Sequence, residues 1–330
     1  MTIRLVSCDI GGTHARFALA QVSHGGSIAL GEAITFETRD YPSFTLALQA
    51  FAHLQGTHLP QALAIAIAGP VDANADEGSV IRFTNNPWLI QPGQIAAELA
   101  LDQITLVNDF AAVGHAVARA GAADFLPLTG QSILLPATGM VSIVGPGTGF
   151  GVAQLWRDCS GSYRVHPTEG GHIDFAPVDP VEDAILARLR VRHGRVSVER
   201  MVSGPAIIDT YQMLAAMADT PFLPLDDRTI WQRGISGDDP LCVAAVDRFC
   251  MSLGSVAGDL ALAHGAVGVV VAGGLGLRLR DKLPGSGFAE RFCAKGRFEA
   301  RMAALPVMLL TMPQPGLFGA AAAFAHEHCV

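Results

Sequence analysis

Short apolar runs alternate with amphipathic stretches along the first 110 residues. Residues 43–54 and 92–100 place apolar side chains at helical spacing, whereas the runs around them are short and bounded by turn residues, as strands are. The predicted strands cover 3–10, 16–22, 33–38, 63–69 and 104–109. This alternation of strands with helices predicts an α/β fold.

The same alternation returns in a second series. Residues 140–156 form an apolar stretch that a glycine-rich turn interrupts, and 218–240, rich in proline, glycine and aspartate, is predicted to be a surface excursion between helices. Because 330 residues exceed the usual size of a single hydrophobic core, two lobes are expected. The other predicted elements are helices at 180–193, 204–217, 240–264 and 316–327 and strands at 267–274 and 306–310.

Composition and charge exclude several classes of protein. The longest apolar runs, such as 267–272, are far shorter than the ~18 residues that cross a bilayer. The first residues enter a strand without the regions of a signal peptide, and six cysteines without a CxxC pair fit a reducing compartment. A net charge of −8 without a long lysine or arginine cluster argues against nucleic acid. We therefore expect a soluble, cytoplasmic protein with neither a membrane nor a nucleic-acid partner.

Two glycine-rich turns, in "CDIGGTHARFALA" at 8–20 and "VGPGTGFGVAQL" at 144–155, each lie between two predicted strands. Glycine lets backbone N–H groups approach an anion closely, so the pair indicates a polyphosphate clamp, with two ordinary β-hairpins as the alternative. Neither turn fits GxxxxGK(S/T) or GxGxxG, which excludes the Walker and Rossmann motifs. Asp9 would repel a phosphate unless a cation lay between them, as a hydrated Mg²⁺ does in phosphoryl-transfer sites.

An apolar strand ends at Asn108 and Asp109 and leads into a predicted helix. In open α/β sheets, ligands bind at this end of the strands. A carboxylate held there can accept the proton of a hydroxyl group that attacks a phosphorus atom. The alternative is helix capping, for which Asn-Asp is a common signal.

Two further polar segments favour a ligand rich in hydroxyl groups. Glu169 and His172 flank a glycine pair in "HPTEGGHIDF", and Glu199 lies in "VSVERMVSGPA". His166 and Asp174 could join Glu169 and His172 in a metal site, but HExxH is absent and the glycine pair opposes the helix that would align the ligands. We therefore expect no transition metal.

Several motifs, in order along nearly the whole chain, resemble those of the bacterial glucokinase family (non-ROK group) of the hexokinase/actin-like ATPase superfamily. They are "DIGGTHARFAL", "VNDFAAV", "GPGTGFGVA", "EGGHIDFAP", "SVERMVSGPA" and "AGGLGLRL". The resemblance implies an α/β, two-lobed actin-like ATPase (ribonuclease H-like) fold with a central interlobe cleft. The small domain would comprise 1–119 plus 309–330, including a returning C-terminal helix, and the large domain 120–308.

The resemblance also implies an activity and its partners. The protein would transfer a phosphoryl group from ATP, with Mg²⁺, to the 6-hydroxyl of D-glucose, giving glucose 6-phosphate and ADP, the first step of glucose use in glycolysis. Homodimers are common in the family, so a homodimer is implied by analogy.

Site residues are implied position by position. Asp109 would be the base, and the sugar hydroxyls would meet Asn85, Asn108, Glu169, His172 and Glu199. The first phosphate loop would comprise Cys8, Asp9, Ile10, Gly11, Gly12 and Thr13, with Asp9 meeting Mg²⁺ through water. The second would comprise Gly145, Gly147, Thr148 and Gly149, and Gly273 and Gly274 would flank the adenosine.

Two positions depart from the family pattern, and three alternatives stay open. Cys8 and His14 stand where the family commonly has Gly and Asn; we expect Cys8 to face the core and the backbone to satisfy His14. The serious alternative is a kinase for another hexose or another donor, ADP or polyphosphate. A sugar-responsive regulator would need a DNA-reading module, but only eight residues precede Asp9 and a CxCG-type zinc motif is missing. A non-catalytic actin-like ATPase would lack the sugar-binding set.

Overall fold

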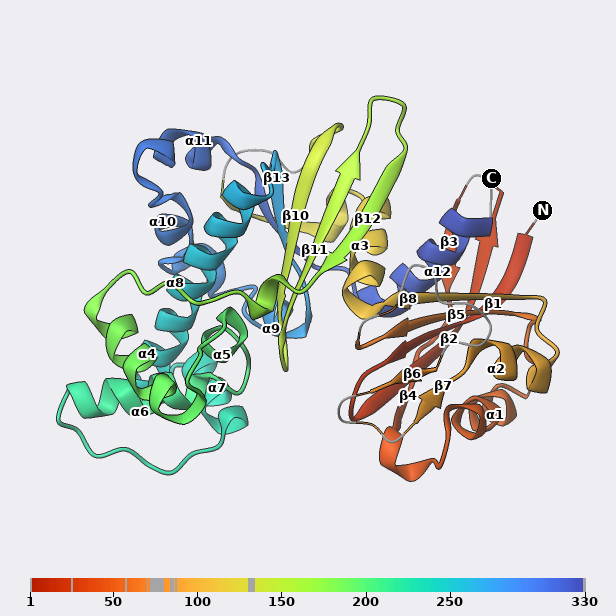
Figure 1. Cartoon of the computed structure of the whole chain (residues 1–330), viewed down its shortest axis with the longest axis horizontal. Helices are drawn as coiled ribbons and strands as arrows, with labels where there is room; N and C mark the ends of the chain where they lie inside the picture. Colours follow the sequence, from red (N-terminus) through yellow and green to blue (C-terminus); the bar gives the residue numbers. More distant parts are fainter. Residues whose placement is uncertain are drawn as a thin grey trace. The chain divides into compact units, whose positions relative to one another are not determined.

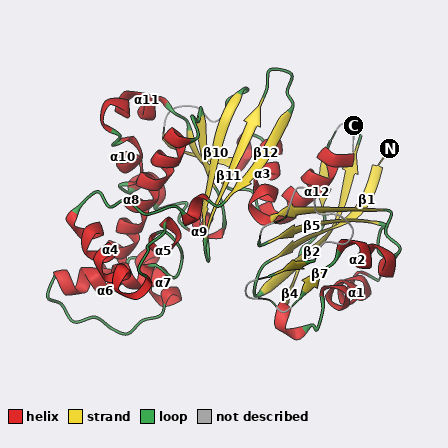
Figure 2. Cartoon of the chain, viewed as in Figure 1, coloured by secondary structure: helices red, strands yellow, loops and turns green. Residues whose placement is uncertain are grey.

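The computed structural model describes residues 2–24, 26–56, 58–69, 71, 80–83, 86, 88–129 and 134–328. The chain divides into two compact units, one formed by Met1–Ala120 with Met312–Val330 and the other by Gly121–Thr311. Each unit combines a mixed sheet with helices, so the α/β prediction is confirmed (Figures 1 and 2).

The first unit is built on a sheet in the order β3-β2-β1-β5-β8, with β4 also paired to β2. The strands β1, β5 and β8 run parallel, whereas β2 runs antiparallel to β1, β3 and β4. The bounds are β1 Thr2–Ile10, β2 His14–Ser23, β3 Ile28–Leu30, β4 Ile34–Glu37, β5 Ala62–Ile67 and β8 Gln103–Asn108, with a separate pair β6 Ile81–Arg82 and β7 Leu89–Ile90.

Helices cover both faces of this sheet (Figure 1): α1 Phe44–Gln55 and α2 Pro92–Leu99 lie on one face, and α3 Asp109–Arg119 and α12 Pro315–His328 on the other. Side chains of a strand alternate between faces, so each strand serves two cores. In β5, the leucine and isoleucines pack toward α1 and α2, whereas the alanines between them pack toward α3 and α12. These small residues bring α12 close: a Cβ on Gly319 would overlap with the Ala112 carbonyl group of α3.

The second unit has a sheet in the order β12-β11-β10-β13-β14-β9. The strands β10, β13 and β14 run parallel, and β9, β11 and β12 are antiparallel to their neighbours. The bounds are β9 Phe125–Thr129, β10 Gly139–Pro146, β11 Phe150–Arg157, β12 Tyr163–Thr168, β13 Gly268–Val271 and β14 Val307–Leu310. The helices are α4 Pro180–His193, α5 Val198–Met201, α6 Ile207–Met217, α7 Asp227–Ser236, α8 Pro240–Ala263, α9 Gly274–Arg278, α10 Phe288–Cys293 and α11 Glu299–Ala304.

The central helix of this unit, α8, is long and apolar enough to cross a bilayer by length and composition. However, 67% of its apolar window is buried within the protein, as expected of a core helix in a soluble protein. The side chains of α4, α6, α7 and α10 pack around it in one continuous core.

The prediction that 218–240 is a surface excursion is wrong for its second half. Asp226 caps α7 by accepting from the Thr229 N–H, and Ile230 and Trp231 are buried against α8. The proline, glycine and aspartate of this segment suggested a loop, but its second half forms a ten-residue helix with only three buried positions, Ile230, Trp231 and Gly234.

Candidate functional site

Polar residues of the first unit meet at the carboxyl edge of its parallel strands. Strand register aligns Ile10 of β1 with Ile67 of β5, and Ile67 with Asn108 of β8. Asp9 therefore lies one residue from the same sheet edge as Asn108, two strand spacings away, which is about 10 Å. The structure thus brings the first glycine-rich turn and the Asn108–Asp109 pair to one edge, where α/β sheets bind ligands.

The first glycine-rich turn is held through its carbonyl groups. Gly11 donates to the His14 carbonyl oxygen at 2.9 Å, the Thr38 hydroxyl donates to the Gly12 carbonyl oxygen at 3.0 Å, and the Asn86 amide donates to Gly11 O at 3.3 Å. The Thr38 N–H donates to the Thr13 carbonyl oxygen at 2.9 Å. With its carbonyl groups fixed, the turn can present N–H groups to an anion without rearranging.

Asp9 sits below this turn with its side chain 19% exposed. Its Oδ2 pairs with Arg16 Nη1 at 3.1 Å, and burial raises the pKa of the Asp9 carboxyl while Arg16 partly offsets that rise. A Cβ on Gly316, at the start of α12, would lie 2.7 Å from the Asp9 carboxylate. Glycine at this position therefore lets the start of α12 pack directly against the carboxylate of Asp9.

The two departures from the family pattern have structural explanations. Cys8 is fully buried in β1, as expected, and burial together with Asp9 raises the pKa of its thiol well above the usual value. The expectation that backbone satisfies His14 is wrong: its Nδ1 lies 2.8 Å from Thr13 Oγ1, and its Nε2 lies 3.0 Å from Glu37 Oε1 on the paired strand β4. The His14 ring therefore links Thr13 of the first glycine-rich turn to Glu37 of β4.

Asn108, and not Asp109, fills the capping position that the sequence left open. Asn108 is the N-cap of α3: its Oδ1 accepts from the Phe110 and Ala111 N–H groups, and its Nδ2 donates to the Gly69 carbonyl oxygen at 2.9 Å. Asp109 is the first residue of the helix, and its Oδ1 accepts from the Phe110 N–H at 2.8 Å. Asp109 therefore lies at the positive end of the α3 dipole, where a helix accommodates negatively charged groups.

In the second unit, Glu199 and the second glycine-rich turn are in direct contact. Glu199 Oε2 accepts from the Phe150 N–H at 2.9 Å, and a Cβ on Gly149 would overlap with that carboxylate. The turn itself is closed by Gly147 N–H donating to the Gly149 carbonyl oxygen at 2.9 Å. Gly204, five residues after Glu199, donates to the Gly147 carbonyl oxygen at 2.7 Å.

The loop that carries Glu169 and His172 packs on the same Phe150 backbone. A Cβ on Gly171 would overlap with the Phe150 carbonyl oxygen, so only glycine permits this approach. The Glu169 and His172 side chains are 73% and 57% exposed, with Oε2 and Nε2 3.9 Å apart. Three of the predicted sugar-binding residues of this unit therefore gather around Phe150.

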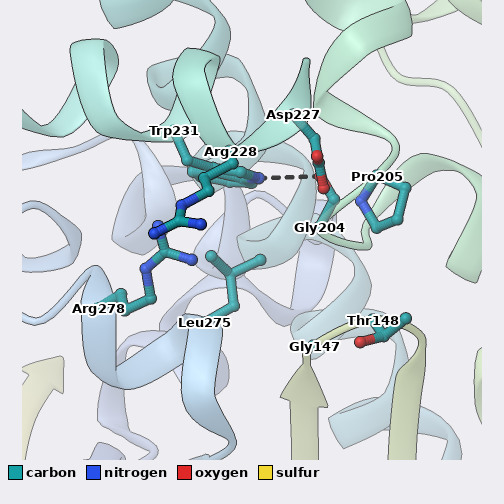
Figure 3. A pocket seen from close by; sticks show the side chains of 9 residues that line it. All are labelled: Gly147, Thr148, Gly204, Pro205, Asp227, Arg228, Trp231, Leu275 and Arg278. Atoms are coloured by element: carbon teal, nitrogen blue, oxygen red, sulfur yellow. Dashed lines mark hydrogen bonds between the residues drawn. The ribbon is translucent and has the colours of Figure 1, made fainter. Parts of the chain in front are cut away.

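A pocket of about 490 Å³ opens beside the second turn (Figure 3). The Trp231 indole N–H donates to the Gly204 carbonyl oxygen at 2.8 Å, while Arg228 and Arg278 point toward one another across one end. Sequence reasoning missed most of this lining, because it comes from α7 and α9. The residues that line it are Gly147, Thr148, Gly204, Pro205, Asp227, Arg228, Trp231, Leu275 and Arg278.

Two glycines predicted to flank adenosine directly precede Leu275, which lines this pocket. Gly273 has φ +87° and precedes α9, and a Cβ there would lie 3.1 Å from the Pro146 carbonyl oxygen, which brings Gly273 and Gly274 next to the second turn. A smaller hollow of about 290 Å³ shares Thr148 and Pro205 with the pocket and includes Glu199. Thr148 thus borders both hollows.

Two predictions concern residues or ligands that the structure does not place. Asn85 lies outside the described residues. Within the described ranges, no three histidine, cysteine, aspartate or glutamate side chains form a group that could hold a metal ion.

Comparisons with known proteins agree along the whole chain. A family model described as Glucokinase matches residues 6–327. The glucokinase of Zymomonas mobilis is 52% identical over 326 residues, covering 99% of this chain and 99% of that protein. A solved glucokinase from an Antarctic psychrotroph superposes with a TM-score of 0.81 at 33% identity, covering 97% of this chain and 98% of the other. A glucokinase from Balamuthia mandrillaris, solved in complex with glucose, shares the fold with a TM-score of 0.77 at 21% identity, covering 98% and 93%.

Proposed function

This chain belongs to the glucokinase family and phosphorylates glucose, and we propose that it transfers the γ-phosphoryl group of Mg²⁺-bound ATP to the sugar's 6-hydroxyl. The products are glucose 6-phosphate and ADP. Its fold is the two-lobed actin-like ATPase fold. The observation that carries the proposal is the position of Asp109, at the start of α3 and at the sheet edge that also bears the first glycine-rich turn.

Asp109 is the base in this proposal. Its carboxylate accepts the 6-hydroxyl proton as that oxygen attacks the phosphorus atom, the bond to the ADP oxygen breaks, and ADP leaves with the electron pair. One Asp109 oxygen is already held by the Phe110 N–H, which fixes the orientation of the carboxylate. Proximity and orientation supply much of the rate enhancement in phosphoryl transfer, so a base held in a fixed orientation is expected to speed the reaction.

The remaining sugar hydroxyls are bound by Asn108, Asn85, Glu169, His172 and Glu199. Carboxylates accept hydrogen bonds, the His172 ring can donate and accept, and the Asn108 amide has one N–H left to donate because its oxygen already accepts from two N–H groups, so the set can discriminate each ring hydroxyl. An epimer would leave one of these groups unpaired, which costs about 1–3 kcal/mol.

The phosphates of ATP lie along the two glycine-rich turns. Cys8 to Thr13 form the first, with the fully buried Cys8 and Ile10 side chains anchoring it, and Gly145 to Gly149 form the second. Asp9 would hold Mg²⁺ through a water ligand, and the ion would neutralise negative charge on the phosphates. The ion pair with Arg16 and the close packing of Gly316 hold the Asp9 carboxylate in a fixed position.

The adenosine occupies the 490 Å³ pocket in this proposal, because that pocket is lined by Thr148 of the second turn and by Leu275 and Arg278 of α9, which begins at Gly274 directly after Gly273. Leu275 offers an apolar wall, and Asp227 can accept from ribose hydroxyls. The planar guanidinium groups of Arg228 and Arg278 can stack on a purine ring. Both arginines line the pocket, so they are placed to contact a ligand that enters it.

Replacing Arg228 or Arg278 with glutamine is expected to raise the KM for ATP about threefold to tenfold, because stacking of a cation on a ring contributes about 1 kcal/mol. The KM for glucose should stay within a factor of two or so of the unmodified enzyme. Steady-state kinetics with each substrate varied in turn measures both. Arg280→Gln, which alters an exposed arginine just past α9, is the control. Equal KM values for ATP in all three variants would show that the adenosine does not bind in this pocket.

The activity is tested by ADP release with Mg²⁺ and ATP, with and without glucose, compared with mannose, galactose, fructose and N-acetylglucosamine. Strong stimulation by glucose, with glucose 6-phosphate as the product, is expected. Parallel reactions with ADP or polyphosphate as donor distinguish the alternative kinases. Stimulation by another sugar alone, or ATP turnover without sugar dependence, would contradict the proposal.

The enzyme acts in the cytoplasm in this proposal, and as a homodimer. Five of the six cysteines are described and all five are free thiols, which fits a reducing compartment. The homodimer is supported by the family resemblance alone. Light scattering of the eluting protein at working concentrations measures its mass directly and decides between monomer and dimer.

A further inference from the structure

Two segments of the second unit run side by side beneath the sugar-binding residues. The Phe175 N–H donates to the Val196 carbonyl oxygen at 3.1 Å, and the Val198 N–H donates to the Ile173 carbonyl oxygen at 2.9 Å. Asp174 and Ser197 form an antiparallel bridge between these two hydrogen bonds. The loop of Glu169 and His172 is therefore paired through its backbone to the segment that leads into α5 and Glu199.

One side chain reinforces this pairing. Arg195 Nη2 donates to the His172 carbonyl oxygen at 2.6 Å, and Arg195 Nε lies 2.6 Å from Asp174 Oδ1. A guanidinium group offers these donors in a rigid, planar fork, so a single side chain holds two fixed points of the loop. Both points flank Ile173, directly after His172.

The contribution of this contact to folding is small. Arg195 and Asp174 are 60% and 75% exposed, and exposed ion pairs contribute roughly 0–1 kcal/mol because water screens them. The His172 loop, in contrast, exposes the side chains that are proposed to bind sugar and includes two glycines, so it depends on outside contacts for its shape. The contact therefore affects the position of the loop more than the stability of the protein.

We propose that Arg195 is a positioning residue for glucose. It holds Glu169 and His172 in register with Glu199, which lies four residues after Arg195 and is itself fixed to the Phe150 N–H. The proposal rests on the function proposed above, in which these three residues bind sugar hydroxyls. In this proposal Arg195 acts through its contacts with His172 and Asp174 and does not itself bind a substrate.

Replacing Arg195 with glutamine is expected to raise the KM for glucose about tenfold, since one charge-assisted hydrogen bond and its partner are lost. The KM for ATP should change less than about twofold, and Tm less than about 2 °C. Arg195→Lys keeps the charge but loses the fork, so it should recover only part of the affinity for glucose. Discrimination between glucose and mannose should weaken in parallel, because the hydroxyl-binding groups are less ordered.

Matched variants separate the possible explanations. Arg280→Gln removes an arginine of similar exposure that pairs with Asp281, and it should leave the KM for glucose unchanged. Asp174→Asn should raise that KM, and the double variant with Arg195→Gln should be less than additive, because both changes release the same contact. If His172→Ala raises the KM for glucose but Arg195→Gln does not, the positioning role is wrong while the sugar site stands. If neither changes it, the sugar site itself is misplaced.

Discussion

Replacing Asp109 with asparagine is expected to lower kcat by a factor on the order of 10² or more, with a much smaller change in the KM for glucose. Asparagine has the same shape, and its oxygen can still accept from the Phe110 N–H, so the start of α3 should remain intact. What it cannot do is accept the 6-hydroxyl proton. The loss therefore falls on the chemical step.

Single-turnover phosphorylation of glucose measures this step directly. The control is Asp102→Asn, which should retain normal kcat. Asp102 directly precedes β8, so its carboxylate lies at the opposite end of that strand from Asp109. Asp109→Ala should be at least as slow as Asp109→Asn. A near-normal kcat in Asp109→Asn, with unchanged Tm, would mean that another group accepts the proton.

Replacing Gly171 with alanine is expected to reduce kcat/KM for glucose on the order of 10²-fold. The added Cβ would overlap with the Phe150 carbonyl oxygen, and a backbone atom cannot move aside as a flexible side chain can. The loop of Glu169 and His172 must therefore shift outward, and a shift of about 1 Å at a reactive site can cost a factor of this size.

Kinetics with glucose and with ATP, together with thermal unfolding, distinguish a displaced loop from a damaged fold. Gly285→Ala is the matched control, because a Cβ there meets no atom within 4 Å and its backbone conformation suits alanine. A small loss of Tm with a large loss of kcat/KM is the expected outcome for Gly171→Ala. Retention of kcat/KM would show that the loop does not need to rest on Phe150 for catalysis.

Local patterns predicted much of the site, because its central features are continuous in sequence. The two glycine-rich turns connect adjacent antiparallel strands, and the Asn108–Asp109 pair follows its strand directly. The capping alternative is confirmed for Asn108, which caps the helix and leaves Asp109 as its first residue, and the catalytic role of Asp109 stays a proposal. The sequence alone could not decide which of the two residues is the N-cap, because asparagine and aspartate are both common at that position.

Contacts between distant residues could not be read in the same way. Gly316 packs against Asp9 from 307 positions away in the sequence, and Arg195 donates to the loop of His172. His14 illustrates the same limit: its partner Glu37 lies on a strand whose register with β2 no local pattern reveals. The pocket beside Thr148 was not predicted for a different reason. Asp227, Arg228 and Trp231 of its lining lie on α7, and the proline- and glycine-rich sequence of that segment had predicted a loop instead of a helix.

The most direct test of this account is a crystal structure of the enzyme with glucose and a non-hydrolysable ATP analogue. The account predicts the glucose 6-hydroxyl within about 2.6–3.2 Å of the Asp109 carboxylate, with Glu169, His172 and Glu199 bonded to other ring hydroxyls. The analogue's phosphates should lie on the two glycine-rich turns and its base between α7 and α9. Glucose bound without contact to Asp109, or with its 6-hydroxyl facing Glu199, would contradict the assignment of the base and of the residues that bind the sugar.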